Sequence, residues 1–262
     1  MNDPTTPAAT PQDRGWRGDL LLAASFLTRL PLPLCPTMAA GALARAMRTF
    51  PLVGAALGLA AGLAAMLLNA VLPPLPAALL TVLVLVLATG ALHEDGLADF
   101  SDGLGARGDR DRRLEVMRDS RNGTFGVVAL ILSIGLRASA LAEIPEGWAQ
   151  VGALVAAASL SRGLIPAVMQ ILAPARPDGL GAAAGCPDAS VAAAAAGLGL
   201  LASIFGLGFG GALTALVLAG LVGWAMAGVA RRAFGGYTGD VLGAVQQGGE
   251  IAILLAAAMV WA

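Results

Sequence analysis

The chain has 262 residues, of which 57% are hydrophobic and 13% are charged, and its formal net charge is -1. A soluble domain carries about 25% charged residues, so this composition excludes an ordinary water-soluble globule and indicates a membrane protein. The small net charge gives no global attraction to nucleic acid, and we expect no nucleic-acid partner.

The N-terminal region is predicted to stay outside the membrane. Residues 1–18 are polar and contain prolines and acids, which is typical of a disordered cytoplasmic tail and unlike a cleavable signal peptide. The apolar run 20–34 is short and ends in Pro31 and Pro33, so we expect it to be interfacial or re-entrant. Residues 19–262 are predicted to form one transmembrane catalytic domain.

Seven later runs approach the length of about 20 apolar residues that a membrane crossing needs. The sequence therefore predicts an all-α polytopic membrane bundle of about seven transmembrane helices, embedded in the bilayer. It does not decide between a monomer and a homo-oligomer. Small residues dominate the later runs, which allows helices to approach closely. The predicted spans are 51–72, 75–92, 124–143, 149–172, 189–206, 209–230 and 249–262, and glycines in 206–211 separate the fifth from the sixth.

Arginine is confined to alternate connections of this topology. The connections near 73–76, 144–148 and 206–211 contain none. Because short cytoplasmic loops carry the excess of positive charge, the arginine-bearing side is predicted to face the cytoplasm of a bacterial inner membrane. The arginines of these loops are Arg45, Arg48, the six between 107 and 121, Arg176, Arg231 and Arg232.

Much of the charge lies between residues 93 and 122, which hold eight acids and six arginines. Asp95, Asp99 and Asp102 stand at i, i+4 and i+7 and share one face of a helix. Three carboxylates that close together repel one another unless a cation lies between them. Their oxygens suit Mg²⁺, which commonly takes one or two carboxylates and completes its shell with water and substrate phosphate.

Arginines in the same segment suit a phosphate ligand, because a guanidinium binds phosphate in a bidentate manner. Arg118 and Arg121 are one turn apart, so the segment combines a metal-binding face with a phosphate-binding face. This combination predicts phosphoryl transfer at a membrane surface. A solvated loop of mixed charge is the alternative, and the many glycines among the charges argue against it.

Polar residues elsewhere add candidates for the same site. Arg137 and Arg162 fall inside predicted spans, where an unpaired charge is costly, and Glu250 is expected to pair with one of them. Arg162 and Asp240 are further candidates for phosphate binding, the latter in a predicted glycine-rich cytoplasmic loop. His93 is either a general base or a hydrogen-bonded residue at a helix end.

The charged segment HEDGLADFSDGLGARGDRDRRLEVMRDSRNGTFGV, from residue 93, resembles the signature of the cobalamin 5'-phosphate synthase family, also called adenosylcobinamide-GDP ribazoletransferase. Four further blocks are similar in the same order, so the resemblance covers nearly the whole chain. They are FLTRLPLP at 26–33, FPLVGAALG at 50–58, SRGLIP at 161–166 and GGYTGDVLGAVQQGGEIAILL at 235–255. Two departures are Glu94, where an apolar residue is expected, and Asn122, where isoleucine is common.

The resemblance implies a Mg²⁺-dependent transferase of the inner membrane, active in cobalamin biosynthesis. It would join adenosylcobinamide-GDP to α-ribazole or its 5'-phosphate and release GMP. The implied metal ligands are Asp95, Asp99 and Asp102, and Arg107, Arg118 and Arg121 would bind phosphate. Asp119 and the metal-side aspartates remain alternative general bases.

Two other functions compete with this one. Asp99, Asp102, Gly103, Ala106 and Arg107 match the first half of the DxxDGxxAR pattern of CDP-alcohol phosphotransferases, but the second half fails because Val116 stands where glycine is needed. A transporter is less favoured, because the acids lie at the end of a predicted span whereas transport sites lie near mid-membrane.

Overall fold

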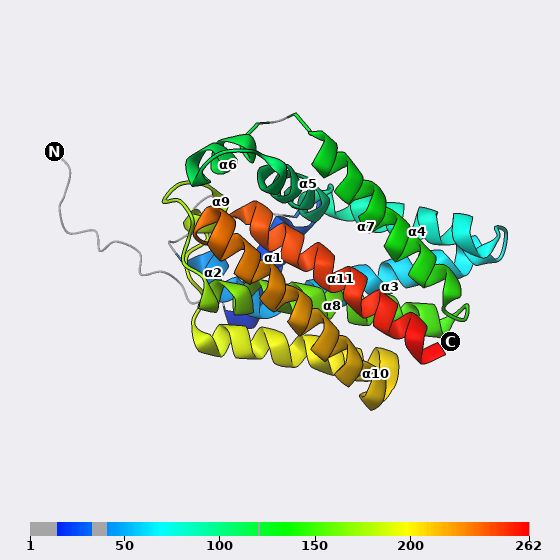
Figure 1. Ribbon diagram of the computed structural model, residues 1–262. Helices are drawn as coiled ribbons and strands as arrows, with labels where there is room; N and C mark the ends of the chain where they lie inside the picture. The colour runs from blue at the N-terminus through cyan, green and yellow to red at the C-terminus, as the bar shows by residue number, and fades with distance from the viewer. Residues whose placement is uncertain (1–14, 33–40, 120, 262) are drawn as a thin grey trace.

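The computed structural model describes residues 15–32, 41–119 and 121–261, and within these ranges the protein is a bundle of helices without strands (Figure 1). This confirms the predicted all-α class. The helices in chain order are α1 (Gly15–Leu27), α2 (Ala42–Ala46), the 3-10 helix η1 (Met47–Thr49), α3 (Phe50–Asn69), α4 (Pro74–Thr89), α5 (Leu92–Gly105), α6 (Arg110–Val116), α7 (Thr124–Glu143), α8 (Trp148–Ile171), α9 (Leu180–Ala183), α10 (Ala189–Phe234) and α11 (Gly239–Trp261).

Several of these helices are suited to a bilayer. In the described part of the chain, five segments are long and apolar enough to cross a membrane, and six are if the bent pair α4 and α5 forms one broken span. The five are Ala42–Asn69, Thr124–Glu143, Trp148–Ile171, Ala189–Phe234 and Gly239–Trp261. A helical polytopic bundle is thus confirmed.

Helix α10 consists of two helical arms joined at a kink. Gly208 has φ 70° and ψ 173°, outside the helical region, in the stretch where the sequence predicts a break. A glycine reaches this conformation because it has no Cβ. The two arms of α10 fold back on each other (Figure 1).

The arginine-bearing segments gather at one end of the bundle. Helices α2, α6 and α9 lie at this end, whereas the α3–α4 turn and the C-terminus lie at the opposite end (Figure 1). We call the first the arginine end. The sequence predicts this separation from the alternation of charged and uncharged connections.

Helix α8 forms the centre of the bundle and packs against α3, α10 and α11. Its contact with α3 depends on glycines one turn apart, because a Cβ added at Gly54 or Gly58 would lie 2.1 or 2.4 Å from a carbonyl oxygen of α8. Membrane helices lack a hydrophobic force between them and rely on such close contact. Small side chains at these positions therefore set the distance between the two helices.

The N-terminal helix α1 has 13 residues, about 20 Å of helix, and is too short to cross a core of about 30 Å. Its Asp19 is buried and forms ion pairs with Arg45 at 3.2 Å and Arg48 at 2.7 Å. Helix α1 is thereby held against α2 and η1. It begins at Gly15, inside the range predicted as a tail, while residues 1–14 and 33–40 lie outside the described residues.

The sequence predicts a loop at 231–248, between the last two spans, but most of this stretch is helical, so the prediction is wrong. Helix α10 continues to Phe234, and α11 begins at Gly239, ten residues before the predicted start of the last span. The glycines and glutamines of this stretch suggest a loop by propensity, yet they are buried against α5 and α8. Tertiary packing overrides weak helix propensity in this stretch, and Asp240 consequently lies in the first turn of a helix.

We predict that Gly58→Ala destabilises the bundle by about 1–3 kcal/mol, the usual cost of overpacking a close contact. The measurement is thermal unfolding of the protein in detergent. Gly135→Ala is the matched control, because nothing lies within 4 Å of a Cβ at that position of α7. Equal stability of the two variants would contradict the close packing of α3 on α8.

Candidate active site

Helix α5 carries the acidic residues and lies across the arginine end. It turns from α4 by 93°, so it does not continue the direction of the preceding span. The turn is made by Gly90 and Ala91, with φ values of 65° and 58°. A left-handed conformation is unfavourable for alanine and persists only where surrounding packing enforces it.

Close packing of α5 on α11 brings a fourth carboxylate to the site. A Cβ added at Gly96 would lie 3.0 Å from the carbonyl oxygen of Asp240, and one added at Gly243 would lie 3.3 Å from the Cα of Gly96. The absence of a Cβ at both positions allows this close approach of the two backbones. Asp95 and Asp99, on one face of α5, thus lie beside Asp240.

The crowding of carboxylates affects Asp99 most. Burial, followed by the negative charges of Asp240, Asp95 and Asp102, raises the pKa of Asp99 to about 7. Desolvation and like charges both disfavour the ionised carboxyl. A cation bound between these groups would relieve the repulsion, so the donor chemistry fits a hard metal ion such as Mg²⁺.

Asp102 has a different environment from the other two aspartates of α5. Its Oδ2 accepts a hydrogen bond from Gly123 N at 2.6 Å, and its Oδ1 accepts one from Gly126 N at 2.8 Å. A Cβ at either glycine would lie within 2.5 Å of the carboxylate. Asp102 therefore binds the N-terminus of α7, where the helix dipole also favours a negative charge.

The predicted ligand set of three aspartates is not assembled as a group. Over the described ranges, no three His, Cys, Asp or Glu side chains are placed to hold one metal ion. Asp102 has both oxygens engaged by α7, which leaves Asp95 and Asp99 as a pair. A pair remains compatible with Mg²⁺, since this ion often takes one or two carboxylates from the protein.

The arginines of the charged segment line cavities beside the C-terminal end of α5. Arg107 and Arg121 border a cavity of about 350 Å³ together with Asp102 and Asp119. Arg118 instead pairs with Asp178 at 2.7 Å in a neighbouring hollow. The structure therefore brings Arg107 and Arg121 to one place and puts Arg118 beside it.

Asp119 is paired with an arginine of the same loop. Its Oδ2 lies 2.7 Å from Arg121 Nη2, and hydrogen bonds from Arg121 lower the pKa of Asp119 to about 2. A carboxylate with so low a pKa binds a proton weakly. It is poorly matched to the role of general base at neutral pH.

Arg162 belongs to the core. Its side chain is buried, its Nη1 donates to the carbonyl of Ala158 at 2.8 Å, and the same atom lies 3.6 Å from Glu250 Oε2. The predicted pairing of Glu250 with an arginine is confirmed. This enclosed guanidinium is not placed to bind a substrate phosphate, so the structure gives Arg162 a structural role.

Glu94 and Arg137 complete a buried ionic network with Arg162 and Glu250. Arg137 Nη1 lies 3.1 Å from Glu94 Oε1 and 3.1 Å from Glu250 Oε1. The network joins α5, α7, α8 and α11, and its two positive and two negative charges cancel. Gln246 and Gln247 donate further hydrogen bonds to Glu250 and Glu94.

Glu94 was not expected to have this role. The family pattern places an apolar residue at its position, and the sequence gives no sign that its partner lies more than forty residues away. The only hint is that Arg137, inside a predicted span, requires a negative partner. The structure shows that Glu94 supplies it.

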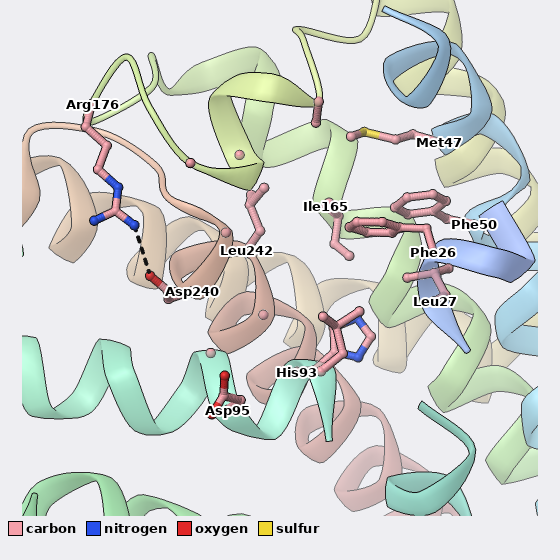
Figure 2. A pocket seen from close by; sticks show the side chains of 17 residues that line it. Phe26, Leu27, Met47, Phe50, His93, Asp95, Ile165, Arg176, Asp240 and Leu242 are labelled. Atoms are coloured by element: carbon pink, nitrogen blue, oxygen red, sulfur yellow. Dashed lines mark ion pairs between the residues drawn. The ribbon is translucent and has the colours of Figure 1, made fainter. Parts of the chain in front are cut away.

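A cavity of about 340 Å³ opens beside the N-terminal half of α5 (Figure 2). His93, Asp95, Asp240 and Arg176 line it, and Arg176 Nη2 lies 3.9 Å from Asp240 Oδ2. Arg176 was not predicted as a site residue. The sequence contained one signal for it: Arg176 lies in a loop predicted on the same side of the membrane as the arginines of the 107–121 segment.

The fold and the site define a polytopic membrane protein with polar cavities, built from aspartates and arginines, at one end of the bundle. A family model described as cobalamin-5-phosphate synthase matches residues 19–258, and the chain belongs to this family. It is an enzyme, a transferase of cobalamin biosynthesis. No solved structure matches the chain.

Curated relatives agree with the family assignment. A protein of Bradyrhizobium diazoefficiens is 51% identical over 92% of this chain and 93% of its own length. Relatives from Mesorhizobium japonicum and Azorhizobium caulinodans are 42% and 47% identical, over 97% and 90% of this chain and 97% and 94% of their own lengths. All three carry the name adenosylcobinamide-GDP ribazoletransferase.

We predict that Glu94→Leu destabilises the protein by about 3–5 kcal/mol, because removal of one partner leaves a buried charge uncompensated. Thermal unfolding in detergent measures the change. The double variant Glu94→Leu with Arg137→Met removes both charges and should recover part of the loss.

The matched control is Glu115→Ala, which breaks the exposed pair of Glu115 with Arg112 on α6. Exposed pairs contribute at most about 1 kcal/mol. A loss for Glu94→Leu no larger than that of the control would contradict the importance of the buried network.

Proposed function

We propose that this chain joins adenosylcobinamide-GDP to α-ribazole or its 5'-phosphate and releases GMP. The observation that carries the proposal is the proximity of Asp95, Asp99 and Asp240 where α5 packs on α11, beside two cavities that each contain an arginine. The names of the relatives supply the substrates. The proposed location is the bacterial inner membrane with the arginine end facing the cytoplasm, which the distribution of positive charge supports.

Mg²⁺ is proposed as the cofactor, with Asp95 and Asp99 as its ligands. When bound, it would neutralise charge on the phosphate oxygens and on the departing GMP. Asp102 is assigned to positioning, because its hydrogen bonds to Gly123 and Gly126 fix the start of α7 relative to α5. The loop between these two helices carries Arg118 and Arg121.

The proposed reaction is a displacement at the phosphorus attached to cobinamide. A hydroxyl oxygen of ribazole forms a bond to this phosphorus, and the bond to the bridging oxygen of the pyrophosphate breaks. GMP leaves with the electron pair, and the hydroxyl proton passes to a carboxylate of the site. Arg107 and Arg121 are proposed to bind phosphate oxygens, with Arg118 beside them.

The general base is proposed among the aspartates of α5 and α11. Asp119 is the weaker candidate because its pairing with Arg121 lowers its pKa to about 2.

The proposed activity is tested with the detergent-purified protein, adenosylcobinamide-GDP and α-ribazole phosphate, with and without Mg²⁺. We expect GMP release to require Mg²⁺ and the molar amount of GMP to equal that of the cobalamin product. Turnover of a CDP-activated lipid without turnover of these substrates would favour the CDP-alcohol phosphotransferase instead.

We predict that Asp95→Ala and Asp102→Ala abolish turnover for different reasons. Asp95 is exposed, so its loss should leave the unfolding temperature unchanged. Asp102→Ala should also lower stability by about 0.5–2 kcal/mol, the cost of losing a helix-capping side chain. The assay is GMP release together with thermal unfolding, and Asp188→Asn, at an exposed position before α10, is the control.

We also predict that the apparent affinity for Mg²⁺ falls as the pH decreases below about 7. Protonated Asp99 cannot bind the ion, and its raised pKa places this competition near neutral pH. Mg²⁺ titrations of GMP release at pH 6 and pH 8 should differ by several-fold. The residual activity of Asp99→Asn should show a much smaller difference, and an unchanged difference would exclude Asp99 as the titrating group.

A further inference from the structure

The cavity at the N-terminal half of α5 has two chemically different ends (Figure 2). It is enclosed by α1, η1, α3, α5, α8, α11 and the connection that contains α9. Asp95, Asp240 and Arg176 lie toward one end, and Phe26, Phe50 and their apolar neighbours lie toward the other, with His93 between them (Figure 2). A ligand that fills this cavity must have a polar part and an apolar part.

The apolar end contains a pair of stacked aromatic rings, which form one wall of the cavity. The rings of Phe26 and Phe50 are nearly parallel, with an interplanar angle of 14° and centroids 6.0 Å apart. Phe50 is 1% exposed, so its ring faces the interior of the protein and not lipid. Leu27, Met47 and Ile165 surround the two rings in Figure 2. Such a wall suits a flat aromatic ring system, because offset stacking and burial both stabilise it.

The polar end offers both acceptors and a donor. Asp95 and Asp240 present carboxylate oxygens, which accept hydrogen bonds from hydroxyl groups. Arg176 Nη1 is buried and has no hydrogen-bond partner in the described structure. A buried donor without a partner carries a free-energy cost, which a polar ligand at this end would remove.

The volume limits the size of the ligand. Small-molecule pockets generally span about 300–1,000 Å³, and this cavity, at about 340 Å³, is near the lower limit. A nucleoside matches that size.

We propose that this cavity binds the nucleoside substrate, with the benzimidazole base of α-ribazole against Phe26 and Phe50 and the ribose beside Asp95 and Asp240. The assignment rests on the proposed function. It deepens that function by giving the nucleoside a site, separate from the arginine-lined cavity that contains Arg107 and Arg121.

The same wall disfavours a guanine base. Guanine carries several donors and acceptors on its edge, and their burial without partners is costly. In the described lining, the side chains around Phe26 and Phe50 are apolar, and His93 is the polar group between the two ends. The dimethylbenzimidazole base of α-ribazole has one unsubstituted ring nitrogen and two methyl groups, so it leaves few polar atoms unpaired against this wall.

The ribose position has a consequence for the reaction. A hydroxyl placed between Asp95 and Asp240 lies next to Asp99, where the crossing of α5 and α11 brings the carboxylates together. The base would therefore act as an anchor that directs the attacking hydroxyl to the acids. Binding of the base and positioning of the nucleophile would depend on one cavity.

The test is equilibrium binding of α-ribazole to the purified full chain, followed by the intrinsic fluorescence of the benzimidazole. Phe26→Ala should weaken binding by about tenfold, within the range found when a base loses its stacking partner. Phe26→Leu keeps apolar volume and should lose less. Phe205→Ala, which removes an 82% exposed ring from α10, is the matched control and should bind α-ribazole as the wild type does.

Steady-state kinetics separates a binding role from a loss of structure. In Phe26→Ala, the KM for α-ribazole should rise about tenfold while the KM for adenosylcobinamide-GDP stays within about twofold, in line with the loss of one stacking partner. The wild type should prefer α-ribosides in the order dimethylbenzimidazole, benzimidazole, adenine, guanine. The variant should show a flatter preference, which a general loss of stability would not produce.

Each result has a distinct meaning. Unchanged α-ribazole binding in Phe26→Ala would overturn the nucleoside site, even if the wild type carries out the proposed reaction. A rise confined to the KM of adenosylcobinamide-GDP would overturn it too, because the cavity would then hold the guanosine end. If the wild type binds α-ribazole without turnover and Phe26→Ala weakens this binding, the result would support the site and contradict the proposed function.

Discussion

The buried ionic network is the interaction on which the arrangement of this protein depends. Glu94, Arg137, Arg162 and Glu250 come from four helices, and each would be costly to bury alone. Together they are neutral, so the cost falls only when α5, α7, α8 and α11 occupy their observed positions. A requirement of this kind specifies one packing of the helices, which apolar contacts between similar small-residue surfaces do not specify.

The acidic site follows from this arrangement. Glu94 is adjacent to Asp95, so the residue that fixes α5 in the core precedes a residue that faces the cavity. The next residue, Gly96, meets α11 and brings Asp240 to the same place. At the other end of α5, Asp102 fixes the start of α7. Helix α5 is thus held at three points along its length, and the carboxylates between them are held apart from the apolar core.

Much of this organisation could be predicted from local patterns. Apolar runs predict the membrane helices, the glycines near 208 predict the break in α10, and alternating arginines predict the common end of the charged loops. What could not be predicted depends on contacts between distant segments. The helical start of α11 reflects packing on α5 and α8, and the pairing of Glu94 with Arg137 joins residues from separate helices. Asp102 resembled its neighbours in sequence, and only the position of α7 distinguishes it.

Two cavities adjoin successive stretches of α5, and different connections border them. One cavity is bordered by the connection that contains α9, and the other by the residues between α5 and α7. Ligands held in them would therefore have separate routes to the surface. Under the proposed function, neither substrate would block the entry of the other, and GMP could depart while the new corrinoid product remains bound. Under the same function, the two substrates would be able to bind in either order.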